Sequence, residues 1–173
     1  MARRQYPVLL LLAIVGCGGS PPPVERRAPS GPAIYLLTVQ HESQMSQSFR
    51  LVALTVIVDG RVVLQQNVDG EDGDAEIEAP VCALREMVQA GSHEVRVELL
   101  YRGRGHGVFS YLSDYRFTVR SEHLVDVPPN AFGVHVKSIG EENGGATTPL
   151  EDRPSIRWVD AIEHEDPNAG CRP

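Results

Sequence analysis

Short apolar runs separated by turn residues characterise the chain from residue 33 onward. Phe49–Val58 (FRLVALTVIV) is rich in β-branched residues, and His93–Tyr101 (HEVRVELLY) places Val95 and Val97 on one face and charged residues on the other. An alternation with a period of two residues predicts a half-buried β-strand. Similar runs predict further strands at 33–39, 61–66, 108–112, 115–120, 123–127, 132–138 and 155–160. The segment 79–90 suits a helical turn as well as a strand.

Turn signals divide these runs at short, regular intervals. Asp59-Gly60 lies between two apolar runs and predicts a two-residue hairpin, because a type I′ turn needs a positive φ at both central residues. Gly91-Ser92 and the glycine-rich segment 102–107 predict further turns. About eight short strands at this spacing predict an all-β fold, a single antiparallel β-sandwich of immunoglobulin-like or transthyretin-like type over residues 33–160.

The N-terminal residues have a different pattern. Arg3 and Arg4 precede an unbroken apolar run, Val8–Val15, of eight residues. Crossing a bilayer requires about 20 helical residues, so this run indicates a secretory signal peptide rather than a transmembrane segment.

The residues that follow the apolar run add a processing site. Ile14-Val15-Gly16-Cys17 resembles the lipobox of bacterial lipoproteins. The resemblance implies a signal peptide over residues 1–16, cleavage before Cys17, and acylation of that cysteine. Gly18, rather than aspartate, follows it, which implies sorting to the outer membrane, on its periplasmic face. Two or three acyl chains anchor a protein stably, whereas one chain binds only marginally.

Residues 17–32 predict a tether. Five of the fifteen residues in 18–32 (GGSPPPVERRAPSGP) are proline, and Val24 is the single large apolar side chain among them. Such a stretch adopts a semi-extended conformation and cannot form a core. The last residues, 161–173, predict an acidic C-terminal tail after the β domain.

The charge of the chain excludes one class of partner. The 173 residues carry a formal charge of −7, and loss of Arg3 and Arg4 with the signal peptide leaves −9. A net acidic chain is a poor ligand for a phosphate backbone, so we expect no nucleic-acid partner. The composition also excludes a polytopic membrane protein and a wholly disordered chain.

Two cysteines remain once Cys17 is acylated. Cys82 and Cys171 form an even pair in an oxidising compartment, where a disulfide is permitted. The alternative is a buried free thiol at Cys82 and an unattached Cys171 in the tail. The spacing alone does not decide between them.

One local pattern supports the fold class. Val58-Asp59-Gly60, followed by Gly91–Val97 (GSHEVRV), is similar to the pattern of PEGA-type and carboxypeptidase-regulatory-like modules. These are small β-sandwich domains on bacterial envelope proteins. The chain departs from them in the acidic insertion after the first hairpin, so the resemblance implies the fold class only.

A second resemblance concerns Tyr101–Arg120 together with 147–154 (TTPLEDRP). These stretches look like short exported bacterial proteins, some of which carry the name dihydrolipoamide acetyltransferase. That activity uses a His-x-x-x-Asp-Gly pattern, and no Asp-Gly pair of the chain has a histidine four residues upstream. The single lysine, Lys137, lies in a strand-like run instead of at the hairpin tip that a lipoyl domain requires. The residues therefore do not support the acetyltransferase name.

The segment 67–78 (NVDGEDGDAEIE) carries six carboxylates. Asp69, Glu71, Asp72 and Asp74 are a candidate Ca²⁺ site, since Ca²⁺ takes about six to eight oxygen ligands. The spacing does not fit an EF-hand loop. The alternative interpretation is a solvated acidic loop.

Aromatic residues and arginines alternate between residues 101 and 120, and this clustering predicts a ligand or partner surface. The functional interpretation is a platform on which aromatic rings stack and arginines bind anionic groups. The alternative is a sandwich core with arginines on its outer face. The candidate residues are Tyr101, Arg102, Arg104, Phe109, Tyr111, Tyr115 and Arg116.

Catalytic signatures are absent from the sequence. It contains no Gly-x-Ser-x-Gly, Ser-x-x-Lys or His-Glu-x-x-His motif, and its six histidines lack metal-ligand spacing. We therefore expect neither enzyme activity nor a cofactor. The expected function is a non-catalytic accessory or protein-interaction module of the cell envelope, held to the membrane by covalent lipid and bound to an envelope protein. The alternative is an envelope module that binds a glycan or Ca²⁺.

Overall fold

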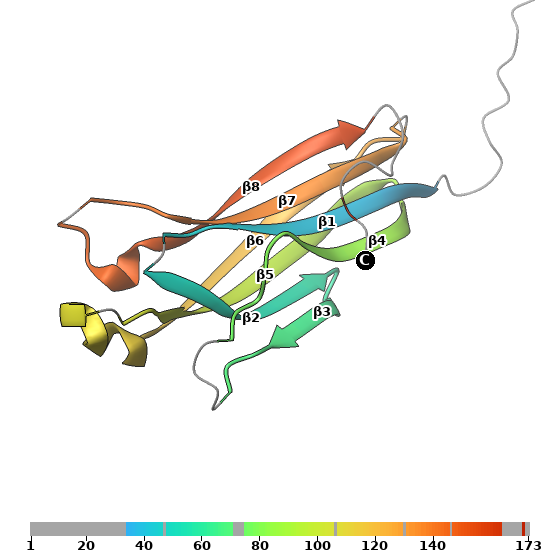
Figure 1. Cartoon of the computed structure of the whole chain (residues 1–173). Coiled ribbons are helices and arrows are strands. Elements are labelled where there is room, and N and C mark those ends of the chain that lie inside the picture. The colour runs from blue at the N-terminus through green and yellow to red at the C-terminus, as the bar shows by residue number, and fades with distance from the viewer. Residues whose placement is uncertain are drawn as a thin grey trace, which may run out of the picture. The chain divides into compact units, whose positions relative to one another are not determined.

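The computed structural model describes residues 34–46, 48–70, 75–105, 107–129, 131–145, 147–163 and 171. The expected signal peptide, Cys17, the tether and most of the acidic tail lie outside the described residues. The described residues form eight strands and two short 3₁₀-helices, with no α-helix among them (Figure 1). The strands are β1 (Ile34–Gln44), β2 (Phe49–Val58), β3 (Arg61–Asn67), β4 (Val81–Gln89), β5 (Gly91–Gly103), β6 (Arg116–Val127), β7 (Gly133–Glu142) and β8 (Pro154–Glu163). The 3₁₀-helices are η1 (Gly107–Asp114) and η2 (Leu150–Asp152).

The strands form two four-stranded sheets, which is consistent with a β-sandwich. Sheet A has the order β4-β1-β7-β8, and sheet B has the order β3-β2-β5-β6. Five of the six strand pairings are antiparallel, but β1 and β7 are parallel. The expectation of a purely antiparallel fold was therefore wrong at this pair. The connection from β6 to β7 is short, and its Phe132 accepts a hydrogen bond from Leu36 near the start of β1. β7 therefore starts beside the start of β1, and the two strands run in the same direction.

The core is built from the inward-facing residues of both sheets. Leu37 and Val39 of sheet A belong to the same buried cluster as Leu54, Val97 and Leu99 of sheet B, and each is at most 1% exposed. The alternation predicted for β5 is confirmed, because Val95, Val97, Leu99 and Tyr101 are buried in turn. Each fully buried side chain of this size contributes about 1.5–3 kcal/mol to folding.

The predicted hairpin at Asp59-Gly60 is confirmed. Their φ angles are 49° and 77°, and they join the antiparallel strands β2 and β3. The ambiguous segment 79–90 forms strand β4, because pairing with β1 satisfies its backbone. The two predicted strands at 115–120 and 123–127 are one continuous strand, β6.

The strand predicted at 108–112 was wrong, because these residues lie in the 3₁₀-helix η1. The glycines before it explain the difference. A Cβ atom at Gly103 would lie 2.1 Å from the carbonyl oxygen of Leu112, and one at Gly105 would lie 2.5 Å from that of Ser110. The absence of side chains at these glycines therefore lets η1 fold back against the end of β5.

A disulfide connects Cys82 of β4 with Cys171, and their Cα atoms are 5.3 Å apart. Cys171 is only 4% exposed and its sulfur lies 3.8 Å from the carbonyl oxygen of Val39. β4 and β8 are opposite edges of sheet A. The bond therefore ties the chain that leaves β8 to the far edge of the same sheet.

The strands define two ends of the domain. The proximal end holds Ile34, the turn at 59–60, and the connections 89–91 and 127–133. The distal end holds the described parts of the connections 44–49, 67–81, 103–116 and 142–154. The length of β1, roughly 35 Å at about 3.3 Å per residue, separates them. In Figure 1 the start of β1 lies at the right and η1 at the left.

Candidate functional site

Three arginines occupy directly paired positions on adjacent strands of sheet B, at the distal end. Arg50 of β2 pairs with Arg102 of β5, and Arg102 pairs with Arg116 of β6. Their chain neighbours Leu51, Tyr101 and Phe117 are buried, so the three arginines are on the opposite, outward side of their strands, because successive side chains of a strand alternate; Arg50 itself is only 8% exposed. Like charges directly opposite each other destabilise a sheet, so this row requires anionic partners.

Asp69 supplies one such partner. Its Oδ2 lies 3.0 Å from Nε of Arg116, and its Oδ1 lies 3.4 Å from Nη1 of Arg102. The Asp69 side chain is 13% exposed. Arg102 is held in place by a hydrogen bond from its Nε to the carbonyl oxygen of Ser113, at 2.9 Å. We refer to Arg102 and Arg116 together as the arginine fork.

A second ion pair lies beside the fork. Arg104, two residues after Arg102, pairs with Glu76. The backbone of Ile77 continues from there and donates to the carbonyl oxygen of Leu51 at 2.8 Å. Asp69 and Glu76, which are described parts of the acidic segment, are thus both bound to arginines of the distal end.

These ion pairs change the interpretation of the acidic segment. Both carboxylate oxygens of Asp69 face arginines, so this residue does not offer a Ca²⁺ ligand in the observed arrangement. Glu71, Asp72 and Asp74 lie outside the described residues. Among the residues that the structure describes, no three or more histidine, cysteine, aspartate or glutamate side chains are grouped as a metal site.

Two tyrosines lie near the fork in sequence and are exposed. Tyr111 of η1 is 53% exposed and Tyr115 is 49% exposed, and their ring centroids are 6.2 Å apart in an edge-to-face arrangement. Tyr115 in turn stacks on the buried Phe117, with centroids 6.1 Å apart. The backbone N–H of Gly103 donates to the carbonyl oxygen of Tyr115, which connects these rings to β5. Tyr115 therefore lies on the Phe117 side of sheet B, whereas Arg102 and Arg116 project from the opposite side. We refer to Tyr111, Tyr115 and the arginine fork, which lie at the same end of the domain, as the distal surface.

Tyr101 was wrongly expected on this surface. Its side chain is fully buried, because position 101 faces the core in the alternation of β5. Burial raises the pKa of its phenol to about 12, with a small opposing effect of Ser43. Its hydroxyl packs against Gly140, where a Cβ atom would lie 2.0 Å from it. Of the other predicted residues, Phe109 belongs to η1 and its side chain lies outside the description.

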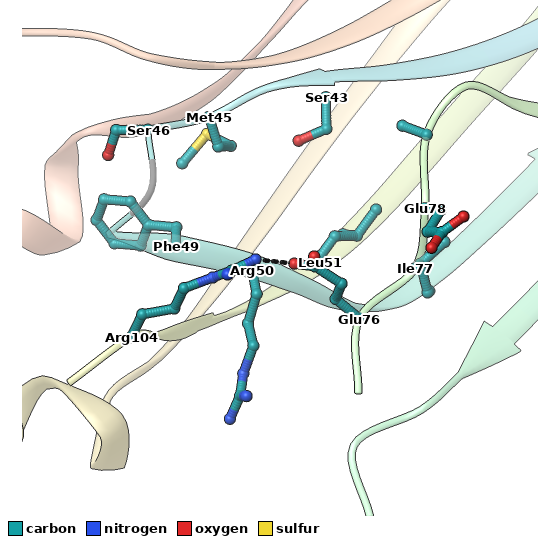
Figure 2. A pocket seen from close by; sticks show the side chains of 11 residues that line it. Ser43, Met45, Ser46, Phe49, Arg50, Leu51, Glu76, Ile77, Glu78 and Arg104 are labelled. Atoms are coloured by element: carbon teal, nitrogen blue, oxygen red, sulfur yellow. Dashed lines mark hydrogen bonds and ion pairs between the residues drawn. The ribbon is translucent and has the colours of Figure 1, made fainter. Parts of the chain in front are cut away.

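A pocket of about 630 Å³ opens at the same end of the domain. Figure 2 shows Ser43 and Met45, from the end of β1, opposite Ile77 and Glu78, with Arg104 reaching across to Glu76. No sequence pattern indicated this pocket, because its walls come from three separate segments. Two arginines, Arg50 and Arg104, and two glutamates, Glu76 and Glu78, line the pocket, so it carries little net charge.

Two histidine contacts were also not anticipated. Nδ1 of His41 lies 3.0 Å from Oγ of Ser138, and burial lowers the pKa of His41 to about 4. Both side chains are fully buried, so this is a core contact with no access for a substrate. His123 lies 2.8 Å from Asp160 and stacks on Trp158, which joins the edge strands β6 and β8. A signal for this second contact was the spacing of Trp158 and Asp160, which places both on one face of a strand.

Comparison with protein-family models, with curated proteins and with solved structures finds no match to this chain. No helix among the described residues is long and apolar enough to cross a membrane. Together, the described residues form an all-β domain with two four-stranded sheets and a charged, aromatic surface at its distal end.

Proposed function

We propose that this protein is a non-catalytic interaction module of the bacterial cell envelope, anchored through acylated Cys17, whose distal surface binds an envelope protein. The observation that carries the proposal is the position of this surface. The fork, Tyr111 and Tyr115 lie at the end of the strands opposite Ile34, the residue through which the chain continues toward the tether. A tether attached at one end leaves the other end accessible to a partner.

The chemistry of the distal surface supports protein recognition. Tyrosine and arginine are enriched among the residues that contribute most to binding energy in protein interfaces. Here both types are held by regular structure, with Arg102 and Arg116 on neighbouring strands and Tyr115 directly before β6. Loops on a rigid scaffold commonly carry binding functions, and the described parts of the connections 44–49, 67–81, 103–116 and 142–154 lie at this end.

We further propose that the domain is an immunoglobulin-like or transthyretin-like sandwich. Two sheets of four strands that share one buried cluster support this assignment. Small sandwich domains of this kind serve as binding modules through the loops at one end.

Glycan binding is the second candidate function. Tyr111 and Tyr115 favour it, because each exposes about half of its side chain and can stack on a sugar ring. The arginine fork favours a partner that carries negative charge. A protein partner explains both features together, so we place it first.

The test is photo-crosslinking in intact envelopes, with a photoreactive amino acid at position 111. We expect a discrete crosslinked product that is lost in the Tyr115→Ala and Arg116→Glu variants. Arg157→Glu is the matched control, since Arg157 is an exposed arginine on β8 of sheet A. A product that persists in both distal variants, or no product at all, contradicts the proposal. The intact mass of membrane-extracted protein tests the anchor, since residues 17–173 plus acyl groups are expected.

A further inference from the structure

The arginine fork uses only part of its hydrogen-bonding capacity. A guanidinium group has five N–H donors. Within the described residues, Arg116 makes one ion pair, through Nε, and Arg102 contacts Asp69 only at 3.4 Å. Charge-assisted hydrogen bonds are typically about 2.7–2.9 Å long, and arginine binds carboxylates best through two parallel bonds. Asp69 therefore fills the fork without saturating it.

We infer that the fork is a recognition site for the carboxylates of an acidic peptide segment, and that Asp69 occupies it as an internal competitor which such a segment replaces. The inference rests on the proposed function and names the chemistry of the partner. Before binding, Arg102 and Arg116 each make one contact to Asp69. When a carboxylate of the peptide replaces Asp69, it can accept two parallel hydrogen bonds from a guanidinium group, so more arginine N–H donors are satisfied than before.

Access supports the exchange. The Arg116 side chain is 53% exposed and contacts Asp69 through Nε, so an incoming group can reach the guanidinium from solvent. Arg102 is 20% exposed and is already oriented by Ser113, so its guanidinium needs no rearrangement to receive a second carboxylate. Asp69 follows β3, an edge strand of sheet B, and is held at its backbone by one hydrogen bond to the Asn67 side chain.

The observed contacts favour an acidic peptide over a lipid surface. The group that the fork holds is a carboxylate on a peptide chain, and Arg104 holds a second one, Glu76, close by. The fork also lies at the end of the domain opposite Ile34.

The test uses a synthetic peptide with the sequence of residues 67–78, NVDGEDGDAEIE, titrated into the full-length protein by calorimetry. The matched control peptide, NVNGQNGNAQIQ, carries amides in place of all six carboxylates. We expect the acidic peptide to bind Asp69→Asn roughly tenfold more tightly than the natural protein, because the competitor has lost its charge. Arg116→Gln should bind at least tenfold more weakly, and Arg157→Gln should bind like the natural protein.

Equal affinity of Asp69→Asn and the natural protein overturns the inference, as does equal binding of the amide peptide. Binding of vesicles containing phosphatidylglycerol by Asp69→Asn, without binding of the peptide, also overturns it and points to lipid phosphate. The arginine Nε resonances of the unmodified protein provide a readout that needs no variant, and those of Arg102 and Arg116 should shift with the peptide. If the peptide fails while the crosslink at position 111 still depends on Tyr115, the inference is lost and the proposed function stands.

Discussion

The imidazole of His93 lies between two hydrogen-bond acceptors, with Nδ1 2.7 Å from Oδ2 of Asp59 and Nε2 2.9 Å from the carbonyl oxygen of Gln89. A neutral imidazole carries a single N–H, so both contacts are hydrogen bonds only when the ring is protonated. Partial burial opposes protonation, but the hydrogen bonds and the Asp59 charge outweigh it and raise the pKa of His93. The protonated ring connects the hairpin at 59–60 with the β4–β5 connection.

This contact should make the protein less stable in mild alkali. Because the folded-state pKa of His93 lies above its ordinary value of 6.5, its contribution is fully present below pH 6.5 and is lost as the pH rises through the folded-state value. We expect a loss of about 1 kcal/mol, the size of one charge-assisted hydrogen bond in a partly exposed position. Denaturant titrations between pH 6 and 9 measure it, and His93→Gln should remove the slope.

Asp59→Asn is the matched control for this prediction. Asparagine tolerates the positive φ of this position and keeps an acceptor for the backbone N–H of Glu94, which lies 3.0 Å from Oδ1 of Asp59. It removes only the charge, so the pKa of His93 should fall in a proton NMR titration. An unchanged His93 titration in this variant would show that the carboxylate does not stabilise the imidazolium.

His41 should make the protein less stable in acid, whereas His93 makes it less stable in alkali. Burial lowers its pKa from 6.5 to about 4, so the neutral ring is favoured in the folded state. Its contribution is therefore fully present above pH 6.5 and is lost as the pH falls toward 4, by about 3 kcal/mol. In His41→Gln the free energy of unfolding should vary much less between pH 4 and 6.5. If the free energy of unfolding of His41→Gln still falls as steeply between pH 6.5 and 4, other groups cause the acid sensitivity.

Gly140 should be required for the burial of Tyr101. A Cβ atom at position 140 would lie 2.0 Å from the Tyr101 hydroxyl, so Gly140→Ala should destabilise the protein by about 1–3 kcal/mol. Combining it with Tyr101→Phe removes the clashing oxygen and should restore most of the loss. The control is Gly145→Ala, because a Cβ there meets nothing within 4 Å. Purely additive effects in the double variant would rule out this contact as the cause.

The disulfide should contribute substantially to stability. Cys82 and Cys171 are 89 positions apart, and closing a loop of this size contributes up to about 4–5 kcal/mol in the entropic model. The double variant Cys82→Ala/Cys171→Ala should therefore unfold at a markedly lower denaturant concentration. The natural protein should reach the same midpoint in the presence of reductant. If reductant leaves the midpoint of the natural protein unchanged, the bond does not contribute.

The local features of the fold were predictable because short-range rules determine them. The Asp59-Gly60 hairpin follows from turn geometry, and the buried face of β5 follows from the alternation of Val95, Val97 and Leu99. Residues 108–112 have a strand-like composition, yet the close approach of Leu112 to Gly103 makes them helical. The parallel pairing of β1 with β7 joins strands far apart in sequence, and periodicity carries no information about such pairing.

The candidate site was predictable only in its composition. The cluster of arginines and aromatic residues between 101 and 120 indicated a surface, and Tyr111, Tyr115 and Arg116 are indeed exposed. The clustering alone did not distinguish the exposed aromatic residues from Tyr101, whose side chain faces the core because of the strand alternation. It also treated the acidic segment as a separate feature, because the pairing of Asp69 with Arg116 spans 47 positions and depends on the register of the four strands of sheet B.

The place of β1 within sheet A determines how the domain responds to a pulling force. β1 is an interior strand, hydrogen-bonded along one side to β4 and along the other to β7. A pull on the chain before Ile34 acts along the axis of this strand. The hydrogen bonds of both ladders then share the load and must break together, instead of opening one by one as at a free edge. We therefore expect β1 to resist extraction by such a pull better than an edge strand of the same sheet.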